Sequence, residues 1–127
     1  GAVRIGHGIR SASDKALMDT LSEKGIYLEM CYSSNMQTHA VDKSQDYPLR
    51  LFIDRGVNVT INTDNMTVSG TTLKREYQIL KKQFAFTENE LKSLALNSAY
   101  AAFLPEADKR LLYDKVNSEF GRWFNAI

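Results

Sequence analysis

The sequence predicts an α/β fold in which three short strands alternate with helices and form a parallel sheet. Two observations carry this prediction. Three segments have strand patterns, and each leads into a helical segment, a spacing typical of parallel strands joined by right-handed crossovers. A third observation concerns architecture, because polar residues follow all three strands, at His7, at residues 33–35 and at residues 64–65. The length of 127 residues favours a small open sheet. The polar strand ends favour the closing part of a (β/α)8 barrel, which needs about 250 residues in all.

The predicted strands are residues 2–6, 25–31 and 57–62. In the third strand every second side chain is polar, so one whole face is polar. A polar face is costly in a buried parallel sheet unless it lines a polar barrel interior or a site. The residues of this face are Asn58, Thr60 and Asn62.

Helix signals separate and follow the strands. Ser13 is expected to cap a helix that ends at Gly25, and Pro48 opens a short helix that Gly56 closes. No linker or repeat interrupts the pattern, so residues 1–127 are interpreted as one partial domain. The later helices are marked by Leu73, Tyr77 and Leu80, by a Thr87–Glu90 capping box with an end at Pro105, and by Leu111, Leu112 and Val116.

Composition excludes several function classes. The formal net charge of +1 gives no electrostatic footprint for nucleic acid. No apolar run approaches the roughly 20 residues that a membrane span needs. The single cysteine, Cys31, cannot form an internal disulfide, which fits a reducing compartment, and we expect a cytoplasmic protein.

Two residues could carry chemistry. His7 lies between Gly6 and Gly8, where an imidazole could handle protons or bind a metal, or simply end a strand. Asp64 directly follows the third strand, where a carboxylate could bind a cation or cap the next helix. Taken alone, capping is the better interpretation of Asp64. His39 is expected on the surface, and Cys31 as a small buried residue. Asp54, Arg55, Lys81 and Lys82 are interpreted as solvated helix faces.

Taken in order, these segments resemble the adenosine deaminase family over nearly the whole chain. Several motifs in the right order are far more specific than any one of them. Residues 4–8 resemble the strand-six motif, and residues 28–31 with Ser34–Asn35 and Gln37–Thr38 resemble strand seven. Residues 57–64 and 67–73 resemble strand eight and its loop, and residues 86–104 resemble the helix that follows.

The resemblance implies an α/β fold that is the C-terminal part, strands six to eight plus following helices, of a (β/α)8 barrel. It also implies zinc-dependent hydrolytic deamination of adenosine to inosine and ammonia. In that family zinc is held by three histidines and an aspartate, and Asp64 matches the aspartate. His7 matches the catalytic histidine that orients the attacking hydroxide.

The chain lacks the rest of the family's site. It has two histidines and no His-x-His pair, so it supplies at most one of four zinc ligands, and the proton-donating glutamate lies upstream. It also reaches its first strand by residue 2 without a lead-in. We therefore expect a piece of a longer chain that is inactive alone. It would need the upstream part of the barrel, or self-association across its open edges.

Three residues depart from the family pattern. Tyr32 replaces a usual proline, His39 a usual glycine, and Asn65 a second aspartate that contacts purine N7. An Asn amide donates to N7 without needing a proton, so Asn65 is expected to bind the substrate. The alternatives are a deaminase acting on adenine, and a non-catalytic α/β domain that binds a ligand or partner at the same strand ends.

Overall fold

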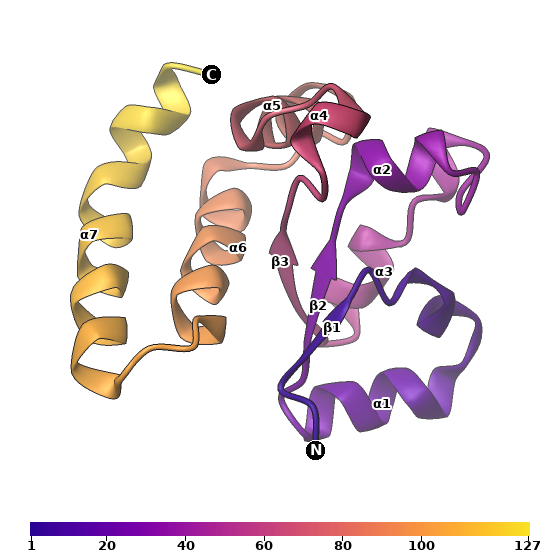
Figure 1. The fold of residues 1–127 in the computed structure, drawn as a ribbon, viewed down its shortest axis with the longest axis horizontal. Coiled ribbons are helices and arrows are strands. Elements are labelled where there is room, and N and C mark those ends of the chain that lie inside the picture. The colour runs from indigo at the N-terminus through magenta and orange to yellow at the C-terminus, as the bar shows by residue number, and fades with distance from the viewer.

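The computed structural model describes residues 1–127 and contains one parallel three-stranded sheet in the order β1-β2-β3 (Figure 1). The strands are β1 (Arg4–Gly6), β2 (Tyr27–Met30) and β3 (Asn58–Ile61). Arg4 pairs with Tyr27, which in turn pairs with Asn58. The predicted α/β class and the three strands are confirmed, with each strand shorter than its sequence pattern.

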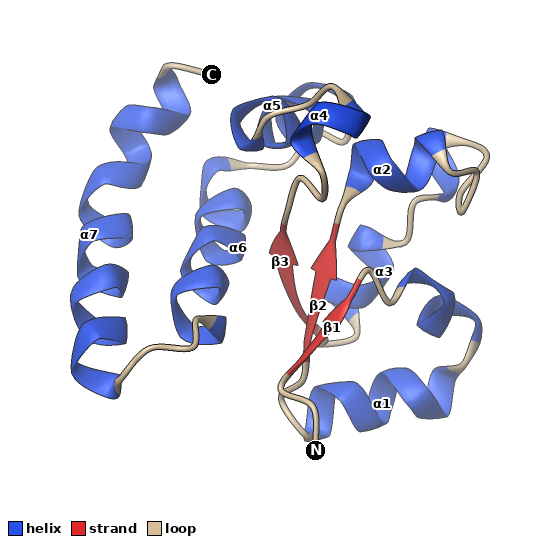
Figure 2. Cartoon of the chain, viewed as in Figure 1, coloured by secondary structure: helices blue, strands red, loops and turns tan.

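Helices connect the strands and then follow the last one (Figure 2). Figure 1 shows α6 and α7 beyond the β3 edge of the sheet, whereas α1, α2 and α3 lie toward the opposite side. Between β1 and β2 lie the 3-10 helix η1 (Ile9–Ser13) and α1 (Lys15–Glu23). Between β2 and β3 lie α2 (Tyr32–Gln37), η2 (Ser44–Asp46) and α3 (Leu49–Asp54). After β3 come α4 (Met66–Ser69), α5 (Leu73–Gln83), α6 (Glu88–Ala101) and α7 (Glu106–Asn125).

The helix boundaries agree with the sequence signals at most ends. Thr87 and Glu90 form the predicted capping box of α6. The predicted cap Ser13 is wrong, because residues up to Ser13 form η1 and Asp14 Oδ1 accepts the backbone N–H of Leu17 instead. The short elements η1, α2, η2 and α4 were not predicted. They have six residues or fewer, too few for a helical period to show.

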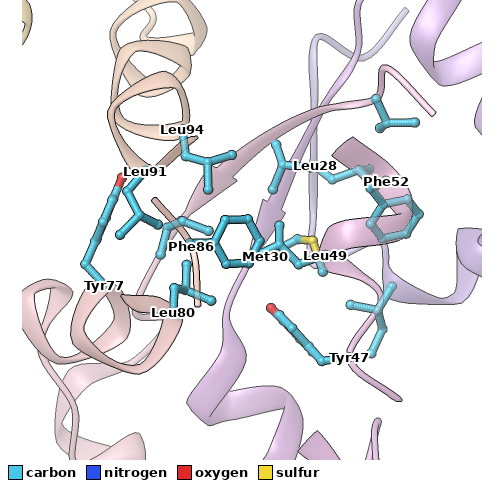
Figure 3. Close-up of a cluster of buried hydrophobic side chains, with 14 of the residues drawn as sticks. Leu28, Met30, Tyr47, Leu49, Phe52, Tyr77, Leu80, Phe86, Leu91 and Leu94 are labelled. Carbon is cyan, nitrogen blue, oxygen red and sulfur yellow. The ribbon is translucent and has the colours of Figure 1, made fainter. Parts of the chain in front are cut away.

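The hydrophobic core lies between the sheet and the helices that cover one of its faces (Figure 3). Leu28 on β2 and Val59 on β3 are paired in register and fully buried. Phe52 from α3 and Leu91 from α6 are also fully buried in this cluster. Burying a large apolar side chain stabilises a fold by about 1.5–3 kcal/mol, so this layer contributes strongly to the stability of the chain.

The other face of the sheet is polar, as the third strand predicted. The Nε atom of Arg4 lies 3.1 Å from the Oε1 atom of Glu29, across the β1–β2 pair. Asn62 Nδ2 donates to Thr60 Oγ1 at 2.8 Å, so polar groups on this face satisfy one another in part. The faces therefore differ in kind: one is apolar and covered by helices, and the other is polar.

The prediction of solvated cations on α5 is half wrong. Lys82 is exposed, but Lys81 donates from Nζ to the backbone carbonyls of Phe124 and Ile127, at 2.9 and 3.1 Å. Its Nζ also lies 4.0 Å from the centre of the Phe124 ring. Lys81 therefore links the C-terminal end of α7 to α5. A charge pattern along one helix could not reveal this contact. Asp54 and Arg55 are exposed, as predicted.

None of the helices is both long enough and apolar enough to cross a membrane.

Candidate functional site at the carboxyl ends of the strands

The structure brings polar side chains from three strand ends into one group. Asn35 Nδ2 lies 3.0 Å from His7 Nδ1, and His7 Nε2 lies 3.6 Å from Asp64 Oδ2. Ser34 donates from Oγ to the same Asp64 oxygen at 2.8 Å. The carboxyl ends of parallel strands are where barrel and open α/β proteins carry their sites. The predicted residues His7 and Asp64 therefore lie together, although 57 positions separate them.

His7 follows β1 in a left-handed backbone conformation, with φ of 55°. Its N–H donates to the Glu29 carbonyl at 2.9 Å, which extends the sheet by one residue and fixes where the imidazole leaves it. Gly8 is also left-handed, with φ of 70°, and a Cβ there would lie 2.6 Å from a methyl group of Leu28. Glycine is therefore required at position 8 by backbone conformation and close packing. A Cβ at Gly6 would meet nothing, so only one of the two flanking glycines is needed for space.

Asp64 does not cap a helix. The capping role that its sequence position alone favoured is therefore wrong. It lies at φ of 57°, and its side chain is 43% exposed at the mouth of β3. The hydrogen bond from Ser34, followed by one from the Asn65 backbone and by the nearby His7, lowers the pKa of Asp64 below its usual value. The side chain is therefore held as a carboxylate acceptor that faces its neighbours and solvent.

Asn65 is the residue that caps the next helix, α4. Its Oδ1 accepts the backbone N–H groups of Thr67 and Val68 at 3.1 and 3.0 Å. Asn65 is exposed and does not line the cavity beside His7 and Asp64. Capping uses the amide oxygen of Asn65 and leaves its Nδ2 group as the donor. The sequence prediction requires this donor, because it has the Asn65 amide donate to an acceptor.

The first turn of α2 supplies two further site residues, Ser34 and Asn35, whose roles were not predicted from the sequence. Ser34 and Asn35 are 6% and 3% exposed, and the Ser34 hydroxyl contacts Asp64 while the Asn35 Nδ2 group contacts His7. The Oδ1 atom of Asn35 is buried without a hydrogen-bond partner. The available signal was their position directly after the apolar second strand. That position cannot show which way a side chain points once α2 has begun.

An open cavity of about 560 Å³ lies against this group. This volume falls within the range of about 300–1,000 Å³ typical of small-molecule sites. Polar groups of His7, Asn35 and Asp64 line part of it, and Ile9 and Leu17 provide apolar wall. The cavity can therefore hold a small, partly apolar molecule whose polar groups face His7 and Asp64.

The side chains at the strand ends supply only part of a metal site. No group of three or more His, Cys, Asp or Glu side chains in the chain could hold a metal. Asp64 fits as one zinc ligand, since it is a carboxylate on the cavity wall, but catalytic zinc usually has three protein ligands. Cys31 is buried, and burial, followed by the nearby Asp64, raises the pKa of its thiol to about 12. His39 pairs with Asp42 at 3.5 Å on the surface, as predicted. The remaining ligands would have to come from outside these residues.

Comparison with solved structures defines the class of protein. The fold matches an adenine deaminase from Arthrobacter aurescens with a TM-score of 0.87 and 34% identity, over 91% of this chain and 36% of that one. It also matches a zinc-bound amidohydrolase from Burkholderia ambifaria with a TM-score of 0.85 and 20% identity, over 98% of this chain and 35% of that one, which shows the fold alone. The chain is therefore part of a deaminase-type (β/α)8 barrel, and the barrel prediction is confirmed over the open sheet.

Sequence comparison gives the family. The family model described as Adenosine deaminase matches residues 1–119, so the chain belongs to the adenosine deaminase family. It is 48% identical to an adenosine deaminase of Haemophilus ducreyi over 94% of this chain, and 42% identical to one of Enterococcus faecalis, also over 94%. The chain spans only 35% and 36% of the lengths of these two relatives.

Proposed function

We propose that this chain is the closing part of a barrel that hydrolyses adenosine to inosine and ammonia. The observation that carries the proposal is the convergence of His7, Asn35 and Asp64 on one cavity at the carboxyl ends of the strands. Relatives named adenosine deaminase, at up to 48% identity, support the choice of reaction. The match to the adenosine deaminase family, for which the sequence resemblance implies zinc, supports a metal in the completed site.

Asp64 and His7 would have different roles. Zinc, held by Asp64 together with ligands from outside this chain, would supply a Lewis acid that makes water a nucleophile at neutral pH. His7 would orient the water for attack on C6 of the purine and stabilise the charge that develops there. Asn35 would hold the imidazole through its 3.0 Å contact with Nδ1, and Ser34 would hold the carboxylate.

Asn65 would bind the substrate through its Nδ2 group. Purine N7 is an acceptor, and the α4 cap leaves Nδ2 as the free donor of this side chain. The same contact is available for adenosine and for adenine. The 34% identical adenine deaminase makes adenine the second candidate substrate. A cytoplasmic location, expected from the single buried cysteine, stays a prediction.

The test uses a completed barrel, meaning this sequence preceded by the missing strands. These would be taken from its own upstream coding sequence or from the Haemophilus ducreyi relative. We expect zinc-dependent conversion of adenosine to inosine with release of one ammonia, and a lower kcat/KM for adenine. A higher kcat/KM for adenine would replace the substrate but keep the reaction.

The isolated chain separates the proposal from its non-catalytic alternative. Purified residues 1–127, free of full-length enzyme, should show no turnover with or without added zinc, because no group of three or more ligating side chains in the chain could hold a metal. Turnover by this chain would contradict the need for outside ligands. A completed barrel that binds adenosine but does not turn it over would favour the non-catalytic binding domain.

A further inference from the structure

A buried carboxylate lies behind the site, on α5. Glu76 is 0% exposed, and it accepts hydrogen bonds from the Ser33 backbone N–H at 3.1 Å, from Ser33 Oγ, and from Thr71 Oγ1 at 2.6 Å. No lysine, arginine or histidine lies within ion-pair distance of it. Burying a carboxylate without a cation is costly unless its hydrogen bonds are satisfied. Here two donors come from the first turn of α2 and one from the loop before α5.

These hydrogen bonds cap the N-terminus of α2 with a residue from another helix, α5. The residue at the capping position, Cys31, makes no side-chain bond to the helix, so the first N–H groups of α2 have no local partner. Glu76, which lies 43 positions further along the chain, accepts a hydrogen bond from the N–H of Ser33. A carboxylate is a favourable partner at a helix N-terminus, because the helix dipole leaves positive charge there. α2 therefore depends on α5 for its first turn.

The same turn carries the side chains that hold the site. Ser34 and Asn35 follow Ser33 directly, and they contact Asp64 and His7. The far end of α2 is also fastened, since Gln37 Nε2 donates to the Ser69 carbonyl at 2.9 Å. Any rotation of the first turn would move Ser34 and Asn35 together. Glu76 therefore limits the positions of both contacts at once.

We propose that Glu76 is a positioning residue for the deaminase site, acting through the first turn of α2. It touches neither the cavity nor Asp64 and His7, and it sets where Ser34 and Asn35 place them. The inference rests on the proposed function for its effect on rate. Its structural part, the dependence of the Ser34–Asp64 contact on Glu76, stands independently of the reaction.

The experiment is Glu76→Gln in the completed barrel. Glutamine keeps the size of the side chain but replaces one acceptor oxygen with an NH2 group, which faces donors and cannot accept from them. We expect kcat to fall about tenfold to a hundredfold, the effect of losing the contact between Ser34 and the proposed metal ligand Asp64. KM should change less than kcat, because Glu76 itself does not line the cavity. A crystal structure should show the Ser34–Asp64 hydrogen bond lengthened or broken.

Controls separate positioning from folding. Leu80→Val truncates a fully buried residue on the same helix that is not bonded to α2, so it should lower Tm without changing kcat per folded molecule. Ser33→Ala removes one hydroxyl bond and keeps the N–H, so it should lower kcat less than Glu76→Gln while remaining folded. Glu76→Asp keeps the carboxylate and should recover part of the lost rate.

The outcomes distinguish the two proposals. Equal kcat per folded molecule in wild type, Glu76→Gln and Ser33→Ala would overturn the positioning role, as would an unchanged Ser34–Asp64 distance in the Glu76→Gln structure. If the wild-type completed barrel turned over neither adenosine nor adenine, the proposed function would fail. The structural comparison would then still decide the role of Glu76 in placing α2.

Discussion

The carboxyl ends of the strands and the helix layer of the core are held in place by different kinds of interaction. At the strand ends, His7 and Asp64 have positive φ, and their side chains are 41% and 43% exposed. In the core, Phe52, Leu49 and Leu91 are fully buried (Figure 3). The site residues are thus held by a few directed hydrogen bonds, and the core by close packing. Changes at the strand ends should therefore alter chemistry with little effect on folding, and changes in the helix layer should do the reverse.

The largest expected effect comes from the two residues at the centre of the site. In the completed barrel, Asp64→Ala should lose zinc and with it all measurable turnover. His7→Ala should retain zinc and lower kcat by about 10²–10⁴, the range that a positioned acid or base contributes. The measurements are zinc per protein by atomic absorption and kcat for adenosine. Tm of the zinc-free proteins should change little in both variants, a comparison that removes the stabilisation by bound zinc itself.

His39→Ala is the matched control, because His39 is also a histidine with φ of 55° but lies on the surface away from the cavity. It should keep zinc, turnover and Tm. An equal loss of zinc in the His7 and Asp64 variants would contradict the division of roles between them. A large loss of Tm in both would contradict the contrast between strand ends and core.

A smaller effect is expected at Asn65, where site and helix structure meet. In the completed barrel, Asn65→Leu should raise the barrier to deamination by about 1–3 kcal/mol, the cost of leaving a buried acceptor of the substrate without a donor. It should also destabilise the fold by about 1 kcal/mol, because the α4 cap is lost. Asn65→Asp keeps the cap and should be milder in both respects, with turnover that depends more on pH.

Thr72→Val separates these two losses. Thr72 Oγ1 caps α5 by accepting the N–H of Arg75 at 3.2 Å, in the next helix along the chain. Its loss should reduce stability by a similar amount and leave kcat/KM unchanged. If Asn65→Leu and Thr72→Val had the same kcat/KM, Asn65 would have no contact with the purine.

The positions of His7 and Asp64 at strand ends were predictable because their signals are local, whereas their proposed roles came from the family resemblance. A histidine between glycines and an aspartate directly after an alternating strand are visible in any single sequence. The partners of these residues were not visible in this way. Asn35 reaches His7, and Glu76 reaches Ser33, only after the chain folds, across 28 and 43 positions. A periodic pattern cannot show which side chains of a helix as short as α2 face the interior.

The helix ends show the same limit. The Thr87–Glu90 capping box was predictable, because both partners lie within one turn. Ser13 was expected as a cap where Asp14 serves, since either side chain is able to accept an N–H and only the course of η1 decides between them. Lys81 was expected in solvent because its partners, the last carbonyls of the chain, lie 43 and 46 positions away.

The smallest expected effect lies in the helix layer, at the pair formed by Arg50 of α3 and Glu90 of α6. Arg50 donates to Glu90, and its guanidinium carbon lies 3.9 Å from the centre of the Phe86 ring. The hydrogen bond from Arg50, and next the Thr87 backbone N–H, lower the pKa of Glu90 from 4.5 to about 2. A carboxyl whose pKa is lower in the folded state stabilises the fold fully above its unfolded pKa. This contribution is lost as the pH falls from 4.5 toward about 2.

In the completed barrel we therefore expect Glu90→Gln to lower the free energy of unfolding by about 1 kcal/mol at neutral pH, the size of a capping contact with a partly exposed ion pair. The difference from wild type should shrink as the pH is lowered through that window, because wild-type Glu90 is then protonated as well. Urea unfolding of both proteins at several pH values between neutral and acidic measures this difference.

Glu88→Gln is the matched control. It removes the same charge from the same turn without removing a hydrogen bond, and it should leave the pH dependence as in wild type. Turnover at neutral pH should be equal in all three proteins. A loss of kcat in Glu90→Gln alone would mean that the helix layer and the strand ends are coupled, and the contrast between them would not hold.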